Sequence, residues 1–284
     1  ESTKHMNEFI NSSVEKIDEY IELYNKTFNK FDKNRKYFDW LYKKNPSGQF
    51  VGIDCYFNNI IIGQVGGIPL EFYYLGRKLR FLISINVCVD PAHQGKKLFS
   101  KMAIKFEKLA EKLNFDGIIA IANKAATPAW QKSINLNLLK QLDVLIGFNR
   151  FKDENFNKDD YNFYSSWNNE KLKWRIENTH NKTFLRTENQ RVNSVYSVTD
   201  YPFLQAYAPL IFTDKLINTN TNNKFLLKPI IFIGLTKKIT KNLFIKLPEV
   251  LKPSPLNFLY KFIKSNNKLD SKKVFFTFLD FDVF

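Results

Sequence analysis

Cysteine and histidine are scarce in this sequence. The two cysteines, Cys55 and Cys88, both fall in apolar strand-like runs, where they suit buried small side chains and not a disulfide framework. The three histidines, His5, His93 and His180, form no metal-binding or triad pattern. We therefore expect no metal site, and a reducing cytoplasm as the compartment.

Long apolar runs are also missing. No stretch approaches the roughly 20 apolar residues that span a bilayer, and no signal peptide is visible. Hydrophobic residues make up 44% and charged residues 25% of the chain, as in soluble globular proteins, and 284 residues suffice for one large or two modest domains. Residues 1–6 resemble a cloning scar ahead of a start methionine, and we set them apart from the fold.

Acidic residues are few relative to basic ones, at 28 against 43, which gives a net charge of +15. This balance fits either a generally basic, solvated surface or an attraction for phosphorylated ligands. Nucleic acid is disfavoured as a partner, because the sequence shows no zinc-finger spacing, no helix-turn-helix signature and no RNP-like run.

The segment from Ser84 to Phe148 has the clearest pattern. Two short apolar runs, at 83–89 and 117–122, predict strands, and a polar turn at 90–97 follows the first of them. A helix from 98 onward is predicted by apolar residues at three- and four-residue intervals: Leu98, Phe99, Met102, Ala103, Phe106, Leu109, Ala110 and Leu113.

The turn before this helix can bind an anion. A loop entering a helix presents unpaired N–H groups and the positive end of the helix dipole. Gly95 lets a ligand approach the backbone, and Lys96 and Lys97 add positive charge. The pattern therefore predicts a pyrophosphate site, with an ordinary strand-to-helix turn carrying solvated lysines as the alternative.

The run Val87–Met102 resembles the acetyl-CoA motif of the GNAT superfamily of N-acetyltransferases, a strand followed by Gln/Arg-x-x-Gly-x-Gly/Ala and a helix. Gln94 and Gly95 fit, whereas Lys97 and Phe99 stand where the two motif glycines are usual. The flanks Phe38–Pro46 and Leu138–Leu142, with Gly147 and Phe148, resemble a GNAT subgroup associated with surface polysaccharide gene clusters.

The resemblance implies acetyl-CoA as the cofactor, lying along the strand from Asn86. The backbone N–H of Val87 or Cys88 would face the thioester oxygen. The tyrosine that commonly protonates the departing thiolate in this family has no counterpart in 124–135. The implied cofactor-binding residues are Val87, Cys88, Val89, Gln94, Gly95, Lys96, Lys97, Leu98, Phe99 and Asn123.

The acceptor amine must lose a proton before attack. The catalytic hypotheses are Glu71, Asn86 acting through an ordered water, and Asp282. The run Val274–Phe284 predicts a strand with Asp280 and Asp282 on one face, where they would bind a substrate amine, serve as a base or form a charged edge.

Two further side chains have alternative roles. Trp40 would line the substrate site by resemblance, although a core position between helix and sheet is favoured for it. Asp280 would bind substrate as one of the two carboxylates on the strand face. Cys88 as an acyl-carrying nucleophile is disfavoured, since no base is evident beside it.

The fold expected from the resemblance is α/β, an α+β mixed sheet, with a GNAT-like central sheet flanked by helices. Domains are expected at 7–150 and 151–284. The second half repeats a Trp-bearing helix that runs into a strand, with Trp174 in the place of Trp40, which suggests a second, degenerate GNAT-like half on the substrate side.

The resulting functional hypothesis is direct transfer of an acetyl group from acetyl-CoA to the amine of a small acceptor. A nucleotide-linked amino sugar for surface glycan synthesis is the first choice. The alternatives are a non-catalytic CoA-binding or ligand-binding module and an acyltransferase acting on a peptide or cell-wall precursor. The sequence leaves the oligomeric state open.

Overall fold

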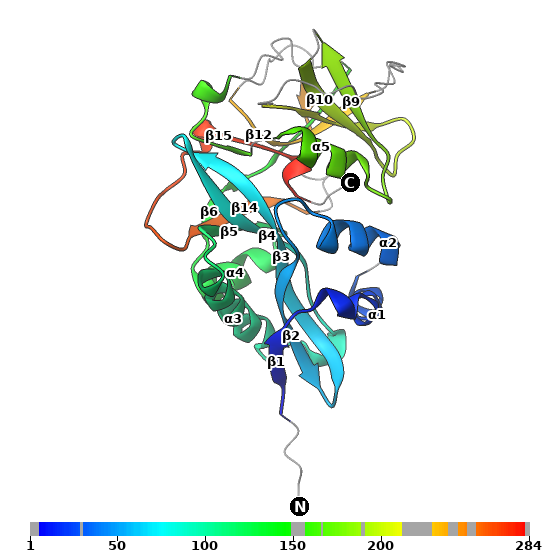
Figure 1. The fold of residues 1–284 in the computed structure, drawn as a ribbon, viewed down its shortest axis with the longest axis vertical. Helices are drawn as coiled ribbons and strands as arrows, with labels where there is room; N and C mark the ends of the chain where they lie inside the picture. Colours follow the sequence, from blue (N-terminus) through cyan, green and yellow to red (C-terminus); the bar gives the residue numbers. More distant parts are fainter. Residues whose placement is uncertain are drawn as a thin grey trace, which may run out of the picture. The chain divides into compact units, whose positions relative to one another are not determined.

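The computed structural model describes residues 6–28, 31–148, 157–165, 167–188, 191–211, 229–237, 244–248 and 254–281. The chain has the expected mixed α/β fold and divides into two compact units (Figure 1). Unit 1 comprises Glu1–Leu70, Arg80–Leu138 and Leu259–Asn266, and unit 2 comprises Glu71–Leu79, Leu139–Phe258 and Asn267–Phe284. The predicted domain boundary at residue 150 stays a prediction. In the structure, the segment Leu139–Phe258 belongs to unit 2.

Unit 1 is built on a mixed sheet in the order β14-β5-β4-β3-β2-β1. Neighbours are antiparallel from β1 to β3, and β4 and β5 are parallel. Asn58 and Asn59, both at positive φ (50° and 61°), make the tight hairpin turn between β2 and β3. The strands are β1 (Glu8–Asn11), β2 (Val51–Phe57), β3 (Ile60–Tyr74), β4 (Arg77–Val89), β5 (Gly117–Ala122), β6 (Asn137–Gln141) and β14 (Asn257–Phe262). The last residues of β3 and the first of β4, like parts of β6 and β14, belong to unit 2.

Helices cover both faces of this sheet (Figure 1). On one face lie α1 (Ile17–Thr27), which continues a 3₁₀ turn at Val14–Lys16, and α2 (Arg35–Phe38), which continues as a π-helical turn at Asp39–Lys43. On the other lie α3 (Leu98–Lys112) and α4 (Ala126–Ile134). The helix predicted from Leu98 is therefore present.

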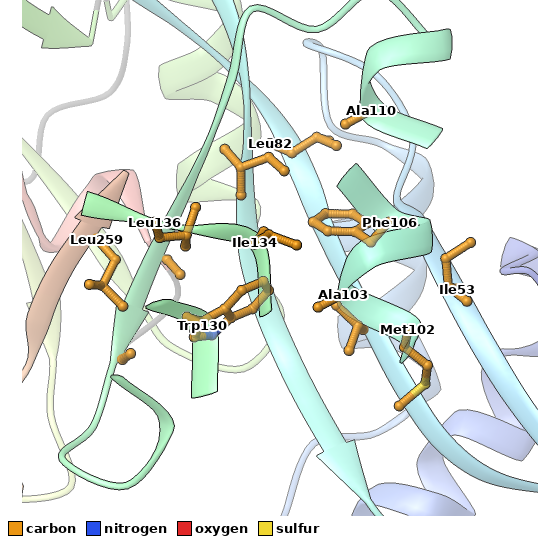
Figure 2. Close-up of a cluster of buried hydrophobic side chains, with 14 of the residues drawn as sticks. Ile53, Leu82, Met102, Ala103, Phe106, Ala110, Trp130, Ile134, Leu136 and Leu259 are labelled. Carbon is orange, nitrogen blue, oxygen red and sulfur yellow. The ribbon is translucent and has the colours of Figure 1, made fainter. Parts of the chain in front are cut away.

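The core of unit 1 forms where the apolar stripe of α3 meets the sheet. Figure 2 shows Met102, Ala103 and Phe106 of α3 turned toward the sheet, together with Trp130 and Ile134 of α4. Met102, Ala103 and Phe106 are fully buried, as the three- and four-residue spacing requires. Cys55 and Cys88 are buried free thiols of the same unit.

Unit 2 contains one α-helix among its described residues, α5 (Asn169–Ile176). As expected, this helix contains the buried Trp174 and is followed in the sequence by the strand β9. Its sheet runs in the order β8-β15-β12-β11-β10-β9, and β7 also pairs with β12 and β13. These strands are β7 (Asp143–Gly147), β8 (Phe163–Ser165), β9 (Thr183–Glu188), β10 (Arg191–Val198), β11 (Gln205–Pro209), β12 (Ile230–Leu235), β13 (Phe244–Lys246) and β15 (Val274–Thr277); 3₁₀ turns lie at Lys158–Asp160, Ser271–Lys273 and Phe278–Asp280.

The predicted strand from Val274 to Phe284 is wrong beyond Thr277. There Thr277 and Asp280 form a capping box, in which the Asp280 carboxylate accepts from the Thr277 N–H (2.7 Å). The box starts a 3₁₀ turn, so Asp280 does not lie on a strand face. Asp282 lies outside the described residues.

No helix in the described part of the chain has the length and apolar character that crossing a membrane requires. Among the same residues, no three His, Cys, Asp or Glu side chains gather closely enough to hold a metal ion.

Candidate functional site

The ladder between the parallel strands β4 and β5 stops before either strand ends. Its pairs run from Phe81 opposite Gly117 to Ser84 opposite Ala120, and β4 continues to Val89 without pairing to β5. Backbone N–H and C=O groups of β4 beyond Ser84 therefore have no partner on β5. Such unpaired backbone at the carboxyl ends of parallel strands is where α/β sheets bind ligands.

Asn86 lies two residues past the end of that ladder and has a left-handed backbone conformation, with φ of 50°. A positive φ inside a strand breaks the alternation of side chains and redirects the strand. Among non-glycine residues, asparagine tolerates this conformation best. The three predicted cofactor-binding residues that follow, Val87, Cys88 and Val89, complete β4.

The polar loop after β4 leads directly into α3. It starts with a 3₁₀ turn, Pro91–His93, in which the Asp90 carboxylate accepts from the Ala92 N–H (2.9 Å). Gln94 folds back, and its Nε2 donates to the Val89 carbonyl oxygen (3.1 Å). Gly95 has φ of 79° and open space around it. The loop therefore brings exposed backbone and two exposed lysines, Lys96 and Lys97, to the N-terminus of α3.

Lys97 is the N-cap residue of α3 and has a left-handed conformation, with φ of 57° and ψ of 22°. The predicted departure from the motif glycine thus carries conformational strain, because a Cβ disfavours this region. The conformation itself is the one that glycine would supply.

Replacing Lys97 by glycine is therefore expected to raise the free energy of unfolding by about 0.5–1 kcal/mol, after allowance for the more flexible unfolded chain. Lys96→Gly is the matched control, because Lys96 is equally exposed but has no positive φ, and it should lower stability by up to about 1 kcal/mol. Urea denaturation of both variants measures the two values. Equal effects would contradict the assignment of strain to Lys97.

Side chains at the start of α3 and in α4 fix the two helices to each other. The rings of Phe99 and Trp130 pack edge to face with centroids 5.0 Å apart, and the Ser133 hydroxyl donates to Ser100 Oγ (2.8 Å). Asn123 follows β5, and its Oδ1 accepts from the Ala126 N–H (2.8 Å) at the start of α4. Leu98 is buried, so its backbone rather than its side chain is available to a ligand.

A chain of buried hydrogen bonds leads from Asn86 into the interior of unit 1. Asn86 Nδ2 and the Tyr42 hydroxyl are 3.0 Å apart, and the hydroxyls of Tyr42 and Tyr24 are 2.9 Å apart. The Tyr24 hydroxyl donates to Gln64 Oε1, and Gln64 Nε2 donates to Asp54 Oδ1 (2.8 Å). The last four of these residues are fully buried.

Sequence reasoning missed this chain because its members come from α1, the π-helical turn and three strands. The signal that could have found it lies in β2 and β3. Asp54 is the one strongly polar side chain of β2, and Gln64 is the one in the apolar first part of β3, before Glu71. A buried polar group requires a partner.

Cys88 is a poor nucleophile. Burial raises the pKa of its thiol to about 12, so the thiolate is scarce at neutral pH. This raised pKa disfavours an acyl-carrying role for Cys88, and direct transfer stays a prediction.

Glu71 belongs to unit 2 and forms ion pairs with Lys171 (2.9 Å) and Lys78 (3.5 Å). Burial raises its pKa, but the two lysines outweigh this effect and hold the pKa below its usual range. A carboxylate stabilised in this way is a weak base, which does not favour the predicted catalytic role.

Asp280 also belongs to unit 2 and is fully buried. Ser165 Oγ donates to its Oδ1, the Thr277 N–H donates to its Oδ2, and the guanidinium of Arg175 lies nearby in the same interior. Burial raises the pKa of Asp280 to about 6. These contacts favour a structural role over the predicted contact with a substrate.

Trp40 lies in the π-helical turn and is 2% exposed, with its ring 5.6 Å from that of Tyr37. This burial favours the core position over the substrate site. The remaining predicted residues of unit 1 lie at the end of β4, in the loop and first turn of α3, or directly after the neighbouring strand β5: Asn86, Val87, Cys88, Val89, Gln94, Gly95, Lys96, Lys97, Leu98, Phe99 and Asn123.

Comparison with known proteins agrees with this geometry. Residues 8–115, less than half of the chain, match the family model of the acetyltransferase (GNAT) domain. A comparison with curated proteins found no match.

Three solved structures share the fold over 91% of this chain. A probable N-acyltransferase from Enterococcus faecalis V583 has 10% identity, 73% of its chain covered and a TM-score of 0.62. The GCN5-related N-acetyltransferase from Anabaena variabilis has 8% identity, 73% of its chain covered and a TM-score of 0.58. Eis1 from Mycobacterium abscessus has 7% identity, 74% of its chain covered and a TM-score of 0.55. At these identities the likeness establishes the fold alone, and it confirms the predicted GNAT-like architecture.

Proposed function

We propose, from the premise that residues 8–115 are a GNAT acetyltransferase domain, that this protein transfers an acetyl group from acetyl-CoA to a primary amine of a small molecule. The observation that carries the proposal is the end of the β4–β5 ladder at Ser84 and Ala120, followed at once by a loop that enters α3. One segment thereby offers unpaired strand backbone and a positively charged helix N-terminus, next to each other in the chain.

The two parts suit the two ends of acetyl-CoA. The amide-bearing pantetheine arm is matched by the backbone of Val87, Cys88 and Val89, which has no partner on β5. The pyrophosphate is matched by the amides that open α3 and by the exposed charges of Lys96 and Lys97. The net charge of +15 favours the approach of a ligand with several phosphates.

Acetyl-CoA supplies an activated thioester, whose carbonyl carbon forms a bond with the amine nitrogen as the bond to sulfur breaks. The backbone N–H of Val87 or Cys88 would donate to the thioester oxygen as negative charge develops on it. The amine loses one proton before attack, and the departing thiolate gains one. Because the pKa of Cys88 is raised to about 12, transfer is direct rather than through this thiol.

A nucleotide-linked amino sugar is our first choice of acceptor. The basic charge of the chain and the resemblance of residues 38–46 and 138–148 to polysaccharide-associated relatives support it. The two cysteines, both buried free thiols, suit a cytoplasmic enzyme. A non-catalytic CoA-binding module is the alternative, since residues 124–135 contain no tyrosine to protonate the thiolate.

Binding is tested first by calorimetry with acetyl-CoA on the wild type, Gly95→Trp and Gly76→Trp. Both glycines have φ of 79° and open space around them, so the two variants carry the same backbone strain. We expect Gly95→Trp to weaken acetyl-CoA binding at least tenfold, because the indole occupies the loop in front of α3, and Gly76→Trp to bind as the wild type does. Equal affinity of the two variants for acetyl-CoA would show that the cofactor does not bind at the 94–99 loop.

Catalysis is tested by the release of free thiol from acetyl-CoA with UDP-glucosamine, glucosamine and lysine methyl ester as amine probes. Turnover with any of them supports the transferase. Tight binding of acetyl-CoA without thiol release from any amine would instead favour the binding module.

A further inference from the structure

We infer that Asn86 holds the acceptor amine through its carboxamide oxygen, and that a buried one-way hydrogen-bond chain anchored on Asp54 fixes the orientation of this carboxamide. The inference rests on the proposed function and deepens it. It assigns an acceptor-contacting residue and three positioning residues, Tyr42, Tyr24 and Gln64. All of these residues belong to unit 1.

Which group donates and which accepts in each hydrogen bond of this chain is set at its buried end, at Asp54. An ionised carboxylate only accepts hydrogen bonds, and Asp54 accepts three, from Ser12 Oγ (2.5 Å), Tyr20 Oη (2.8 Å) and Gln64 Nε2 (2.8 Å). Burial raises the pKa of Asp54, and these three donors oppose that rise. Because Gln64 must turn its NH₂ group to Asp54, its carbonyl oxygen faces Tyr24.

Each hydroxyl has one proton, so the direction passes on without ambiguity. Tyr24 uses its proton on Gln64 Oε1. In the 2.9 Å contact between the two hydroxyls, Tyr24 therefore accepts and Tyr42 donates. With its proton used in this way, the Tyr42 oxygen can only accept from Asn86, which must present Nδ2 (3.0 Å).

The outer end of the chain is therefore a fixed acceptor. With Nδ2 turned to Tyr42, Oδ1 of Asn86 occupies the other branch of the carboxamide, and none of the described residues donates to it. Asn86 is only half-buried, and it lies just past the end of the β4–β5 ladder, where the thioester is proposed to lie. Its left-handed φ of 50° sets the side chain apart from the regular strand pattern.

The chemistry that this acceptor recognises is a primary amine. An ammonium group has three N–H bonds. One proton is lost before attack, and a second leaves the nitrogen as the amide forms and the thiolate is protonated. The third N–H remains in the amide product, and this is the one that donates to Asn86 Oδ1. A neutral carboxamide does not remove the proton, so Asn86 positions the nitrogen and acts as no base. Burial raises the pKa values of Tyr24 and Tyr42 above their ordinary range, so both hydroxyls keep the protons that the chain requires.

The first test removes the acceptor while keeping the backbone conformation. Asn86→Gly tolerates the positive φ but has no carboxamide, and Asn86→Asp retains an outward oxygen. With UDP-glucosamine as the amine, or whichever probe the wild type acetylates, we expect Asn86→Gly to raise the acceptor KM at least tenfold. Asn86→Asp should remain within about threefold of the wild type. The acetyl-CoA KM should not change in either variant.

The second test leaves Asn86 intact and breaks the chain behind it. In Tyr24→Phe the Tyr42 proton loses its acceptor and turns to Asn86, whose amide then flips and presents NH₂ to the amine. We expect the acceptor KM to rise about tenfold with an unchanged acetyl-CoA KM.

The matched control is Tyr56→Phe. Tyr56 is also buried and also joins α1 to the sheet, by donating to Glu19 Oε2 (2.6 Å). It is not a member of the hydrogen-bond chain from Asn86 to Asp54. The Tyr56→Phe variant should have an acceptor KM within about twofold of the wild-type value. A structural loss alone would affect both tyrosine variants alike.

The outcomes separate the two levels of the argument. A wild type that acetylates no amine overturns the proposed function and this inference with it. Turnover by the wild type with an unchanged acceptor KM in Asn86→Gly, or equal effects of Tyr24→Phe and Tyr56→Phe, overturns the inference and leaves the transferase in place.

Discussion

Replacing Asp280 by alanine is expected to lower the free energy of unfolding by about 3–5 kcal/mol, because it removes a fully buried carboxylate that interacts electrostatically with the buried guanidinium of Arg175. Its partner Arg175 is 4% exposed. The Arg175 guanidinium donates to the Leu279 carbonyl oxygen (2.6 Å from Nη2), so it cannot turn to solvent without breaking the C-terminal turn. Burial lowers the pKa of Arg175 to about 10, which still leaves the guanidinium charged at neutral pH.

The alanine variant thus removes a negative charge that stabilises the buried guanidinium of Arg175. It also deprives the Thr277 N–H and the Ser165 hydroxyl of their acceptor, and unsatisfied buried donors cost additional free energy. Urea unfolding of the full chain at pH 7.5, with the slope of the transition compared between variants, measures the loss.

Asp270→Ala is the matched control for this measurement. Asp270 also caps a 3₁₀ turn of unit 2, by accepting from the Lys272 N–H (2.9 Å), but it is exposed and has no buried cation beside it. A loss of about 1 kcal/mol is expected from the cap alone. If Asp280→Ala lost no more than Asp270→Ala, the buried pair would contribute nothing and our account of the C-terminal turn would be wrong.

Reversing the charge of Lys97 is expected to weaken acetyl-CoA binding by about 10- to 100-fold, equivalent to about 1.4–2.7 kcal/mol. Lys97→Glu puts a carboxylate at the N-terminus of α3, where the proposed pyrophosphate would meet a like charge at short range. Because glutamate and lysine are both disfavoured at φ of 57°, the backbone strain is the same in both proteins.

Lys112→Glu separates a local effect from a general one. It makes the same change of formal charge at an exposed position in the last turn of the same helix. Calorimetric Kd values for acetyl-CoA should differ between the variants, and the difference should shrink as salt screens the charges. Equal weakening by both variants would mean that the chain attracts CoA only through its overall charge.

The sequence by itself determined the helices and strands that carry the candidate site. The spacing of Met102 and Phe106 predicted α3, because this pattern depends only on neighbours along the sequence. The anion site in the loop from Gln94 to Lys97 could also be predicted from the sequence. A helix N-terminus has unpaired N–H groups whatever the rest of the fold does.

Only the tertiary structure decided where the β4–β5 ladder ends and which side chains meet there. Asp54, Gln64, Tyr24 and Tyr42 lie 22 to 62 positions from Asn86 in the sequence, and no local pattern encodes the direction of the hydrogen bonds between them. Asp280 gives the converse case. Its alternation with Asp282 reads as a strand, but a capping box with Thr277 turned the chain away. Periodicity reports which face a residue prefers, whereas the partner that satisfies a buried polar group is chosen by packing.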